Sequence, residues 1–178
     1  VSHDLRLPLT RLRLRLEQLP EGESRSAMQR DIEEMDAMVG GTLDYLRAGS
    51  DTEQAVKLNL NALVEGLAED AEAAGAKVSL HGTALPVTAR PQALRRCLAN
   101  LIDNARRYGG GEVEVTIADS AASVEIRIAD RGPGIPAGER ERVFEPYVRL
   151  EASRARHTGG TGLGLAIARA VARAHGGE

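Results

Sequence analysis

The stretch Gly159-Gly160-Thr161-Gly162-Leu163-Gly164-Leu165 leads directly into a predicted helix over residues 163–175. Backbone N–H groups at a glycine-rich helix start can bind phosphate. The stretch lacks the Gly-Lys-Ser/Thr ending of a Walker loop. It also does not follow a strand in a βαβ unit, which disfavours a dinucleotide-binding fold. The stretch therefore predicts a phosphate site outside these two common classes.

A second predicted helix, over residues 91–107, carries polar groups that such a site could use. It starts with Pro91, a residue favoured in the first helical turn. Its apolar stripe is Leu94, Leu98, Leu101 and Ala105, and another side carries Arg96, Asn100, Asp103, Asn104 and Arg107. Asn is a poor helix former unless its amide is used, and Asn100 and Asn104 are one turn apart. The pair could hold a hydrated Mg²⁺ and phosphate oxygens, although a solvated face is the commoner role of such a stripe.

Residues 112–118 and 123–130 alternate in polarity and predict a β-hairpin. The second strand places three apolar residues on one face, Val124, Ile126 and Ile128. The period of two puts Asp130 on the same face, toward the core, where a carboxylate needs a partner. That partner is either a backbone N–H in the following turn or an amine on a bound ligand. Gly132 and Gly134 would let a flat ligand approach the backbone.

Residues 1–49 predict an antiparallel helical hairpin around a break at residues 20–24. Both helices have apolar residues spaced by three and four. These are Leu5, Leu9, Leu12, Leu16 and Leu19 in the first helix and Met28, Ile32, Met35, Val39, Thr42 and Leu46 in the second. A lone hairpin has little to bury this stripe against, so we expect a homodimer through residues 1–49 that forms a four-helix bundle.

Gly40 and Gly41 lie inside the second of these helices, where each Gly costs about 1 kcal/mol relative to Ala. Two explanations remain open. The pair either permits close helix packing, which we favour, or provides a bend point used in signalling.

A linker over residues 50–55 separates the hairpin from a mixed domain over residues 56–178. The further elements expected in this domain are strands at 56–60 and 77–80 and a helix at 61–74 capped by Asn61. Helices layered on one face of a mixed sheet are predicted, so the fold class is α+β.

Composition narrows the possible functions. The 178 residues suit one or two small domains, and the net charge of −3 argues against a nucleic-acid partner. The single cysteine, Cys97, rules out an internal disulfide and fits a reducing compartment. No apolar run approaches the roughly 20 residues of a membrane span. Both ends read as cut, so we expect any membrane segment to lie outside this sequence.

Five motifs in a fixed order carry a family resemblance. They are Ser2-His3-Asp4-Leu5-Arg6-Leu7-Pro8-Leu9-Thr10-Arg11, Asn100-Leu101-Ile102-Asp103-Asn104-Ala105, Asp130-Arg131-Gly132-Pro133-Gly134, Phe144-Glu145-Pro146-Tyr147 and the glycine-rich stretch at 159–165. The set resembles the cytoplasmic core of two-component sensor histidine kinases. The first motif, with residues 31–34 and 44–47, is similar to the subgroup of the osmosensor kinase EnvZ. The resemblance implies a dimerising phosphoacceptor hairpin followed by a Bergerat-type ATP-binding domain, an α/β sandwich.

The resemblance implies ATP and Mg²⁺ as ligands of this domain. Asp130 would bind the adenine amine, Asn104 would ligate Mg²⁺, and Asn100 would lie beside it with a catalytic role. The other implied nucleotide contacts are Arg107, Tyr108, Gly132, Gly134, Gly160, Thr161, Gly162, Leu163 and Gly164. Phe144 and Tyr147 resemble the segment that anchors a lid, here expected over residues 150–158.

The resemblance also implies that His3 is the phosphoacceptor and that Asp4 takes the other ring proton. Adjacent helix residues do not face each other, so the role of Asp4 rests on the resemblance alone. The other histidines, His81, His157 and His175, are expected to be bystanders. The implied partner is the receiver domain of a response regulator, and the implied location is the cytoplasmic portion of an inner-membrane sensor.

One position departs from the family pattern. Four residues after His3, where this group usually has Thr or Asn to position water, the chain has Leu7. Leucine cannot hydrogen-bond water, so we expect weak phosphatase activity with kinase activity retained.

Two other functions compete with a histidine kinase. Related ATP hydrolases carry a Glu as general base one turn before the Mg²⁺-binding Asn, but this chain has Asn100 there, and a hydrolase leaves the His3 hairpin unexplained. A non-catalytic dimerising module with a degenerate nucleotide site is disfavoured by the intact Asn104, Asp130 and loop glycines. The kinase is therefore the function that the sequence favours.

Overall fold

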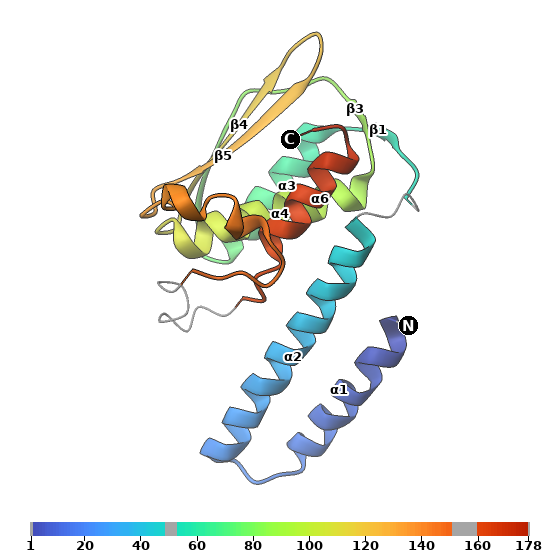
Figure 1. Ribbon diagram of the computed structural model, residues 1–178, viewed down its shortest axis with the longest axis vertical. Helices are drawn as coiled ribbons and strands as arrows, with labels where there is room; N and C mark the ends of the chain where they lie inside the picture. Colours follow the sequence, from blue (N-terminus) through green and yellow to red (C-terminus); the bar gives the residue numbers. More distant parts are fainter. Residues whose placement is uncertain (1, 49–52, 151–159, 178) are drawn as a thin grey trace.

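The computed structural model describes residues 2–48, 53–150 and 160–177, with side chains from Leu7 onward. Two parts follow each other along the chain, a long helical hairpin and a compact α+β domain (Figure 1). None of the helices in the described ranges combines the length and apolar character that a membrane span needs.

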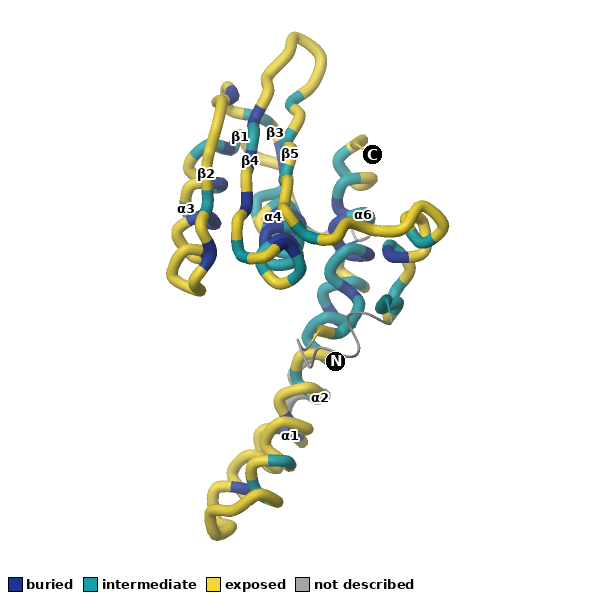
Figure 2. Tube along the Cα trace, turned by 90° about the vertical axis from the view of Figure 1, so that its left-hand side faces the viewer, coloured by how far each residue is buried: buried dark blue, intermediate teal, exposed yellow. Residues whose placement is uncertain are grey.

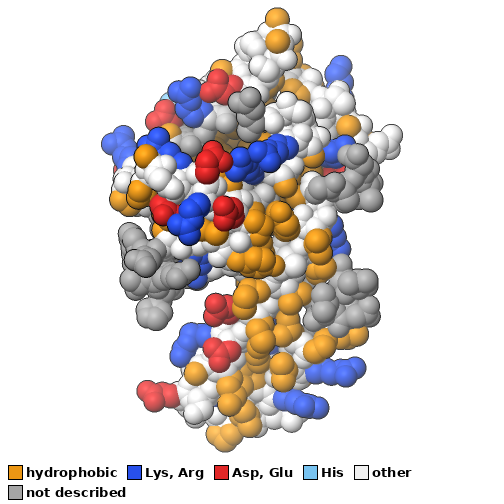
Figure 3. Space-filling view, in the orientation of Figure 1, with side chains coloured by type: hydrophobic (Ala, Val, Ile, Leu, Met, Phe, Trp, Pro, Cys, Tyr) orange, Lys and Arg blue, Asp and Glu red, His pale blue; other side chains and the backbone are white. Residues whose placement is uncertain are grey.

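The hairpin consists of α1 (Ser2–Glu17) and α2 (Glu23–Ala48), which run antiparallel. Arg13 of α1 pairs with Asp36 of α2 at 3.2 Å, and Leu9, Leu16 and Ile32 are buried. Val39 and Thr42 are half-buried, and five further residues of the predicted stripe are exposed, namely Leu12, Leu19, Met28, Met35 and Leu46. Hydrophobic side chains accordingly form a band along the hairpin (Figure 3). The two predicted helices are confirmed, and about half of the described residues of their apolar stripe are exposed.

The sheet of the second part has the order β2-β4-β5, from β2 (Lys77–His81), β4 (Glu112–Asp119) and β5 (Val124–Asp130). β2 runs parallel to β4, and β4 runs antiparallel to β5. Alternate residues of β4 are buried because they face the helices, whereas β5 is more exposed (Figure 2). A separate antiparallel pair joins β1 (Val56–Leu58) to β3 (Val87–Ala89).

Two helices pack on one face of the sheet, α3 (Leu60–Ala73) and α4 (Pro91–Tyr108), and α6 (Gly164–Ala174) packs beside α4. One apolar cluster lies between the sheet, α3 and α4, and a second joins α2, α4 and α6. Two short 3₁₀ helices, η1 (Ala137–Glu139) and η2 (Arg142–Phe144), precede α6. The Arg169 guanidinium of α6 lies 5.2 Å from the centre of the Phe144 ring, which ties η2 to α6.

Three expectations need correction. Asn61 is not the cap of α3, because the Asn59 side chain accepts the Ala62 N–H at 3.2 Å. Asn61 instead holds Ala84, donating to its carbonyl at 2.9 Å and accepting its N–H at 3.0 Å. Strand β3 was not expected, and it forms by pairing with β1. The stripe of α4 is wider than predicted, because α6 buries Ala93 and Cys97 in addition to the sheet-facing side.

Candidate functional site

Two residues of α4, Asn100 and Tyr108, approach the glycine-rich loop. A Cβ built at Gly164 would lie 3.5 Å from Asn100 Oδ1, and one built at Gly160 would lie 3.6 Å from the Tyr108 hydroxyl. Asn104 lies between these two positions on the helix. The loop therefore runs along the side of α4 that carries the predicted amides.

Asp130 ends β5 beside the C-terminal end of α4. Its Oδ1 accepts the Gly132 N–H at 2.7 Å, which is the backbone partner that the sequence left as one alternative. Asp130 lies on the α4 side of β5, the face that the alternation predicts, because it lines the same cavity as Ile126 and Ile128, but the residue is exposed rather than buried in the core. Asp130 is the last residue of β5, and β5 is an edge strand of the sheet, so this residue is accessible to solvent.

Glycines shape this end of the site. A Cβ at Gly132 would lie 2.5 Å from the Tyr108 carbonyl oxygen and 2.8 Å from Asp130 Oδ1, so any side chain there would clash. Gly109 is equally constrained, because its Cβ would overlap the Asp130 side chain. Sequence reasoning missed Gly109, although its place directly after a helix was a usable signal. Gly134 has a left-handed backbone with φ 74°.

A cavity of about 360 Å³ opens between α4 and β5 and brings two of the predicted residues together, Asn104 and Asp130. It is lined by Leu101, Asn104, Ala105, Glu125, Ile126, Arg127, Ile128 and Asp130. Its volume is at the lower end of the range for small-molecule sites, and its walls combine apolar side chains with a few polar groups. The amide of Asn104 and the carboxylate of Asp130 both line this cavity. The carboxylate could accept a hydrogen bond from a ligand amine, and the amide oxygen could ligate a Mg²⁺ ion bound to phosphate.

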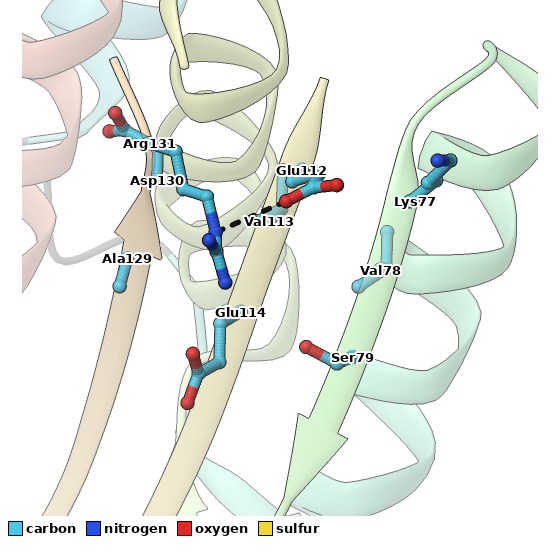
Figure 4. Close-up of a pocket in the computed structure, with 9 residues that line it drawn as sticks. All are labelled: Lys77, Val78, Ser79, Glu112, Val113, Glu114, Ala129, Asp130 and Arg131. Atoms are coloured by element: carbon cyan, nitrogen blue, oxygen red, sulfur yellow. Dashed lines mark ion pairs between the residues drawn. The ribbon is translucent and has the colours of Figure 1, made fainter. Parts of the chain in front are cut away.

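A second hollow of about 190 Å³ lies on the opposite, solvent-facing side of the sheet. Lys77, Glu112, Glu114 and Arg131 supply its charges, and Arg131 pairs with Glu112 at 3.1 Å (Figure 4). The Asp130 carboxylate points away from these side chains (Figure 4). Asp130 lines both hollows, but its carboxylate belongs to the site on α4.

Two further predicted residues have partners of their own. Arg107 Nε donates to Asp103 at 2.7 Å, so its charge is partly engaged one turn back along α4. His175 accepts the Arg90 N–H at 3.1 Å on Nε2, and its Nδ1 lies 2.9 Å from the Val171 carbonyl oxygen, far from the predicted chemistry. Its role is to join the end of α6 to the start of α4.

The glycine-rich loop is hydrogen-bonded to the segment at Tyr147. The Tyr147 N–H donates to the Gly162 carbonyl at 2.9 Å, and a Cβ at Gly162 would lie 2.7 Å from the Tyr147 carbonyl carbon. Gly162 has a left-handed backbone with φ 71°, and the next residue of the loop, Leu163, is fully buried. The loop thus needs glycine at residue 162 for both space and backbone conformation.

Some predicted residues fall outside this description. His3 and Asp4 lie in the first turn of α1, and their side chains are outside the described residues. The same holds for residues 151–158 of the expected lid.

Comparisons with known proteins agree with this geometry. Residues 89–178 match the family model described as Histidine kinase-, DNA gyrase B-, and HSP90-like ATPase. The chain is 39% identical over 178 residues to the sensor histidine kinase GtrS of Pseudomonas aeruginosa, covering 100% of this chain and 37% of GtrS. It is 36% identical over 189 residues to the sensor protein RstB of Escherichia coli, covering 99% of this chain and 43% of RstB. The chain spans less than half the length of these curated relatives.

Solved structures show the same relationship. Full-length ShkA in complex with AMPPNP is similar with a TM-score of 0.74 and 29% identity, over 98% of this chain and 40% of ShkA. The mycobacterial sensor histidine kinase MprB is similar with a TM-score of 0.57 and 30% identity, over 70% of this chain and 81% of that one. The expected α+β fold with a Bergerat-type ATP-binding domain is confirmed. The chain belongs to the Histidine kinase-, DNA gyrase B-, and HSP90-like ATPase family, and its resemblance to the core of sensor histidine kinases is confirmed.

Proposed function

We propose that this chain is the kinase core of a sensor histidine kinase, which phosphorylates its own His3 from ATP and passes the phosphoryl group to an Asp of a response regulator. The observation that carries the proposal is the meeting of Asn104 and Asp130 at one cavity, with the glycine-rich loop alongside the same helix. A site with an acceptor for an amine at one end and a phosphate loop at the other suits an adenine nucleotide.

In this proposal ATP lies along α4. The second carboxylate oxygen of Asp130 accepts the adenine amine, while Oδ1 remains bonded to Gly132. Tyr108 flanks the nucleotide, and the phosphates reach Asn100 and the backbone N–H groups of residues 160–164. Mg²⁺, held by the Asn104 amide oxygen, would neutralise phosphate charge.

The proposed transfer has two steps. The unprotonated ring nitrogen of His3 attacks the γ-phosphorus, an N–P bond forms, and ADP leaves with the electron pair of the broken P–O bond. Asp4 takes the proton of the other ring nitrogen, which leaves a neutral phosphohistidine. A regulator carboxylate then attacks the same phosphorus, the N–P bond breaks with its electron pair going to the ring nitrogen, and Asp4 returns the proton to the other ring nitrogen, which regenerates neutral His3.

The assembly follows from the same proposal. Residues 1–49 form the dimerising phosphotransfer hairpin, residues 50–55 a linker and residues 56–178 the catalytic domain. The exposed apolar residues of α1 and α2 support a homodimer. The receiver domain of a response regulator is the protein partner, with no nucleic-acid partner, and the chain is the cytoplasmic portion of an inner-membrane sensor.

Leu7 supports a further detail, weak phosphatase activity. It lies one turn after His3 on α1, and its side chain is exposed, so water reaches this position without a hydrogen-bonding partner from residue 7. We expect Leu7→Thr to raise the rate of dephosphorylation of a phosphorylated regulator about tenfold or more, because the threonine hydroxyl can hydrogen-bond and orient the attacking water. The measurement is phosphate release from the isolated phosphorylated regulator, with Leu14→Thr as control. Brisk release by the unchanged chain would contradict the proposal.

The test of the kinase is labelling with γ-labelled ATP and Mg²⁺, beside a His3→Gln variant. Acid-labile, base-stable label on the unchanged chain and none on the variant is the expected result. Label that persists in His3→Gln would move the acceptor elsewhere. Free phosphate without labelled protein would favour the hydrolase, and bound ATP without either product would favour the degenerate module.

A further inference from the structure

The first turn of α4 takes its hydrogen-bond acceptors from a distant part of the chain. Arg90, the residue before the helix, forms no side-chain cap, and Pro91 has no N–H to donate. The two carboxylate oxygens of Glu53 instead accept the next two N–H groups, from Gln92 at 2.6 Å and from Ala93 at 2.9 Å. A carboxylate at this position also interacts favourably with the helix dipole. Glu53 therefore caps the start of α4, although it lies 39 residues before Gln92 in the chain.

This contact lies at the boundary between the two parts of the chain. Glu53 is the first described residue after the hairpin, and Gln54 and Ala55, which follow it, are exposed. The next attachment within the described residues is strand β1, where Val56 pairs with Ala89. The carboxylate of Glu53 thus fixes the chain to the α+β domain before the first strand of that domain begins.

The end of α2 is attached to the α+β domain by a different kind of contact. Ala48, the last residue of α2, is buried in the apolar cluster that contains Ala93 and Leu163. Further back along α2, a Cβ built at Gly41 would lie 3.0 Å from Leu163 Cδ1, so close packing explains this glycine. Such apolar contacts are non-directional. The bonds of Glu53 are directional and charge-assisted, so they hold the chain at one point of α4.

The start of α4 is also joined to the end of α6. The Arg90 N–H donates to His175 Nε2 at 3.1 Å, and the Arg90 guanidinium donates to the Ala174 carbonyl at 3.3 Å. α4 carries the two asparagines of the proposed ATP site, and α6 follows the glycine-rich loop. The point where Glu53 attaches is therefore joined to both helices that flank the proposed ATP site.

We propose that Glu53 is a positioning residue for the phosphoryl transfer, because it sets the length of chain between the hairpin with His3 and the helix with the ATP site. This inference rests on the proposed function. With Glu53 in place, the four residues 49–52 separate Ala48 from the attachment, and without it the seven residues 49–55 separate Ala48 from β1. The effective concentration of one tethered group at another falls roughly as the −3/2 power of the tether length, so loss of Glu53 should slow transfer to His3 about two- to threefold.

The first experiment tests the contact without any reaction. Glu53→Ala should speed up amide hydrogen exchange at Gln92 and Ala93 about tenfold or more, because both N–H groups lose their acceptor. Glu65→Ala, at an exposed glutamate of α3, is the matched control and should leave the exchange of these two amides unchanged. Equal exchange in Glu53→Ala and in the unchanged chain would mean that the contact is absent in solution, and the inference would fail.

The second experiment measures the rate of His3 labelling at saturating ATP, together with the Kd for ATP. Glu53→Ala should lower the labelling rate about two- to threefold and leave the Kd unchanged, since Glu53 lies outside the proposed ATP site. Insertion of Gly-Ser-Gly after residue 50 creates the same longer spacing with Glu53 intact, and it should lower the rate by about the same factor. An unchanged or raised rate in either variant, or weaker ATP binding that accounts for the loss, would overturn the positioning role.

A further variant separates positioning from helix stability. Arg90→Ser places a hydroxyl at the N-cap of α4, where the extended backbone suits a local bond to the Ala93 N–H. Combined with Glu53→Ala, this change should restore the midpoint of thermal unfolding but not the labelling rate, because the spacing to the hairpin stays longer. Arg90→Ser alone controls for the lost bond to Ala174 and should label at the rate of the unchanged chain. Recovery of the rate together with the stability would reduce Glu53 to a structural cap.

The outcomes separate this inference from the proposed kinase. If label never reaches His3 in the unchanged chain, the kinase and the positioning role both fail, whatever the exchange of the two amides. If His3 is labelled but Glu53→Ala and the insertion leave the rate unchanged, the positioning role alone fails. If both variants slow labelling at unchanged ATP affinity and the local cap does not restore the rate, both proposals stand.

Discussion

Asp130 uses its two carboxylate oxygens differently. Oδ1 accepts the Gly132 N–H at 2.7 Å and fixes the side chain at the mouth of the cavity on α4. The second oxygen remains for a ligand amine. Gly109 and Gly132 keep this corner free of side chains, so the position of the carboxylate is set by backbone on both sides.

Asp130→Asn should lower ATP affinity about 10- to 100-fold, because hydrogen bonds to a charged group contribute about 1.5–3 kcal/mol. The asparagine can keep the bond to Gly132, but it places an NH₂ donor where the adenine amine needs an acceptor. Isothermal titration with ATP measures the effect. Asp70→Asn, at an exposed ion pair with Arg95, serves as control and should leave affinity unchanged. Equal affinity in both variants would remove Asp130 from the site.

Cys97 lies in the apolar cluster that joins α2, α4 and α6, where its Sγ is 3.5 Å from the Ala168 carbonyl oxygen. Burial raises the pKa of the Cys97 thiol from 9.0 to about 11. The thiol is protonated in both states below pH 9. Above that, the unfolded chain loses its proton first, so the stability due to Cys97 falls as the pH rises through the window from 9 to 11.

We therefore expect the free energy of unfolding to drop more steeply at high pH in the unchanged chain than in Cys97→Ala. The difference between the two should shrink by about 2 kcal/mol between about pH 8 and about pH 10.5. Urea denaturation at both pH values provides the measurement. A constant difference would mean that the thiolate is tolerated in the folded state.

At the scale of the element, two asparagines at the start of α3 have different structural roles. Asn59 caps the helix by accepting the Ala62 N–H, whereas Asn61 fixes the chain at Ala84 with two hydrogen bonds. The cap is local, but the second contact joins the start of α3 to the segment before β3.

Asn59→Ala should destabilise the fold by about 1 kcal/mol, the usual effect of losing an N-cap. Asn61→Ala should cost more, about 1–3 kcal/mol, because it leaves the N–H and C=O of Ala84 without their partner. Thermal denaturation of the two variants gives the order. If Asn59→Ala were the more damaging change, the contact at Ala84 would be of little consequence.

At the scale of the whole molecule, the exposed stripe of the hairpin is the surface through which we propose that the chain dimerises. Leu12 lies on the predicted stripe with 41% of its surface exposed, and Leu14 lies on the other side of α1 with 56% exposed. Exposure alone would favour Leu14 as an interface residue, whereas the heptad spacing favours Leu12.

We expect Leu12→Glu to convert the dimer to a monomer and Leu14→Glu to leave it intact, because a charge in a bundle core has no partner. Sedimentation velocity at micromolar concentration distinguishes the two. A monomeric unchanged chain would refute the bundle, and dissociation by Leu14→Glu alone would place the interface on the opposite face.

Most of the fold could be predicted from the sequence. The hairpin, α4, the β4–β5 hairpin and α6 all have apolar periods long enough to read, and the glycine-rich loop precedes α6 as expected. Strand β3 and the two 3₁₀ helices were not predicted; β3 pairs with β1, which lies about 30 residues earlier in the chain. The candidate residues on α4 and β5 were predicted as a set, but Gly109, Leu101 and Ile126 were not assigned to the site.

The sequence by itself determined the order of elements, the family and the residue types of the candidate site, because periodicity and motif spacing are local properties of the chain. Tertiary structure alone decided which surfaces meet. It decided that Asp130 is exposed. It also decided two contacts between segments distant in sequence: α6 covers a second side of α4, and Gly41 and Thr42 contact Leu163 and Tyr147. No period encodes such contacts, because they depend on how whole elements pack against one another.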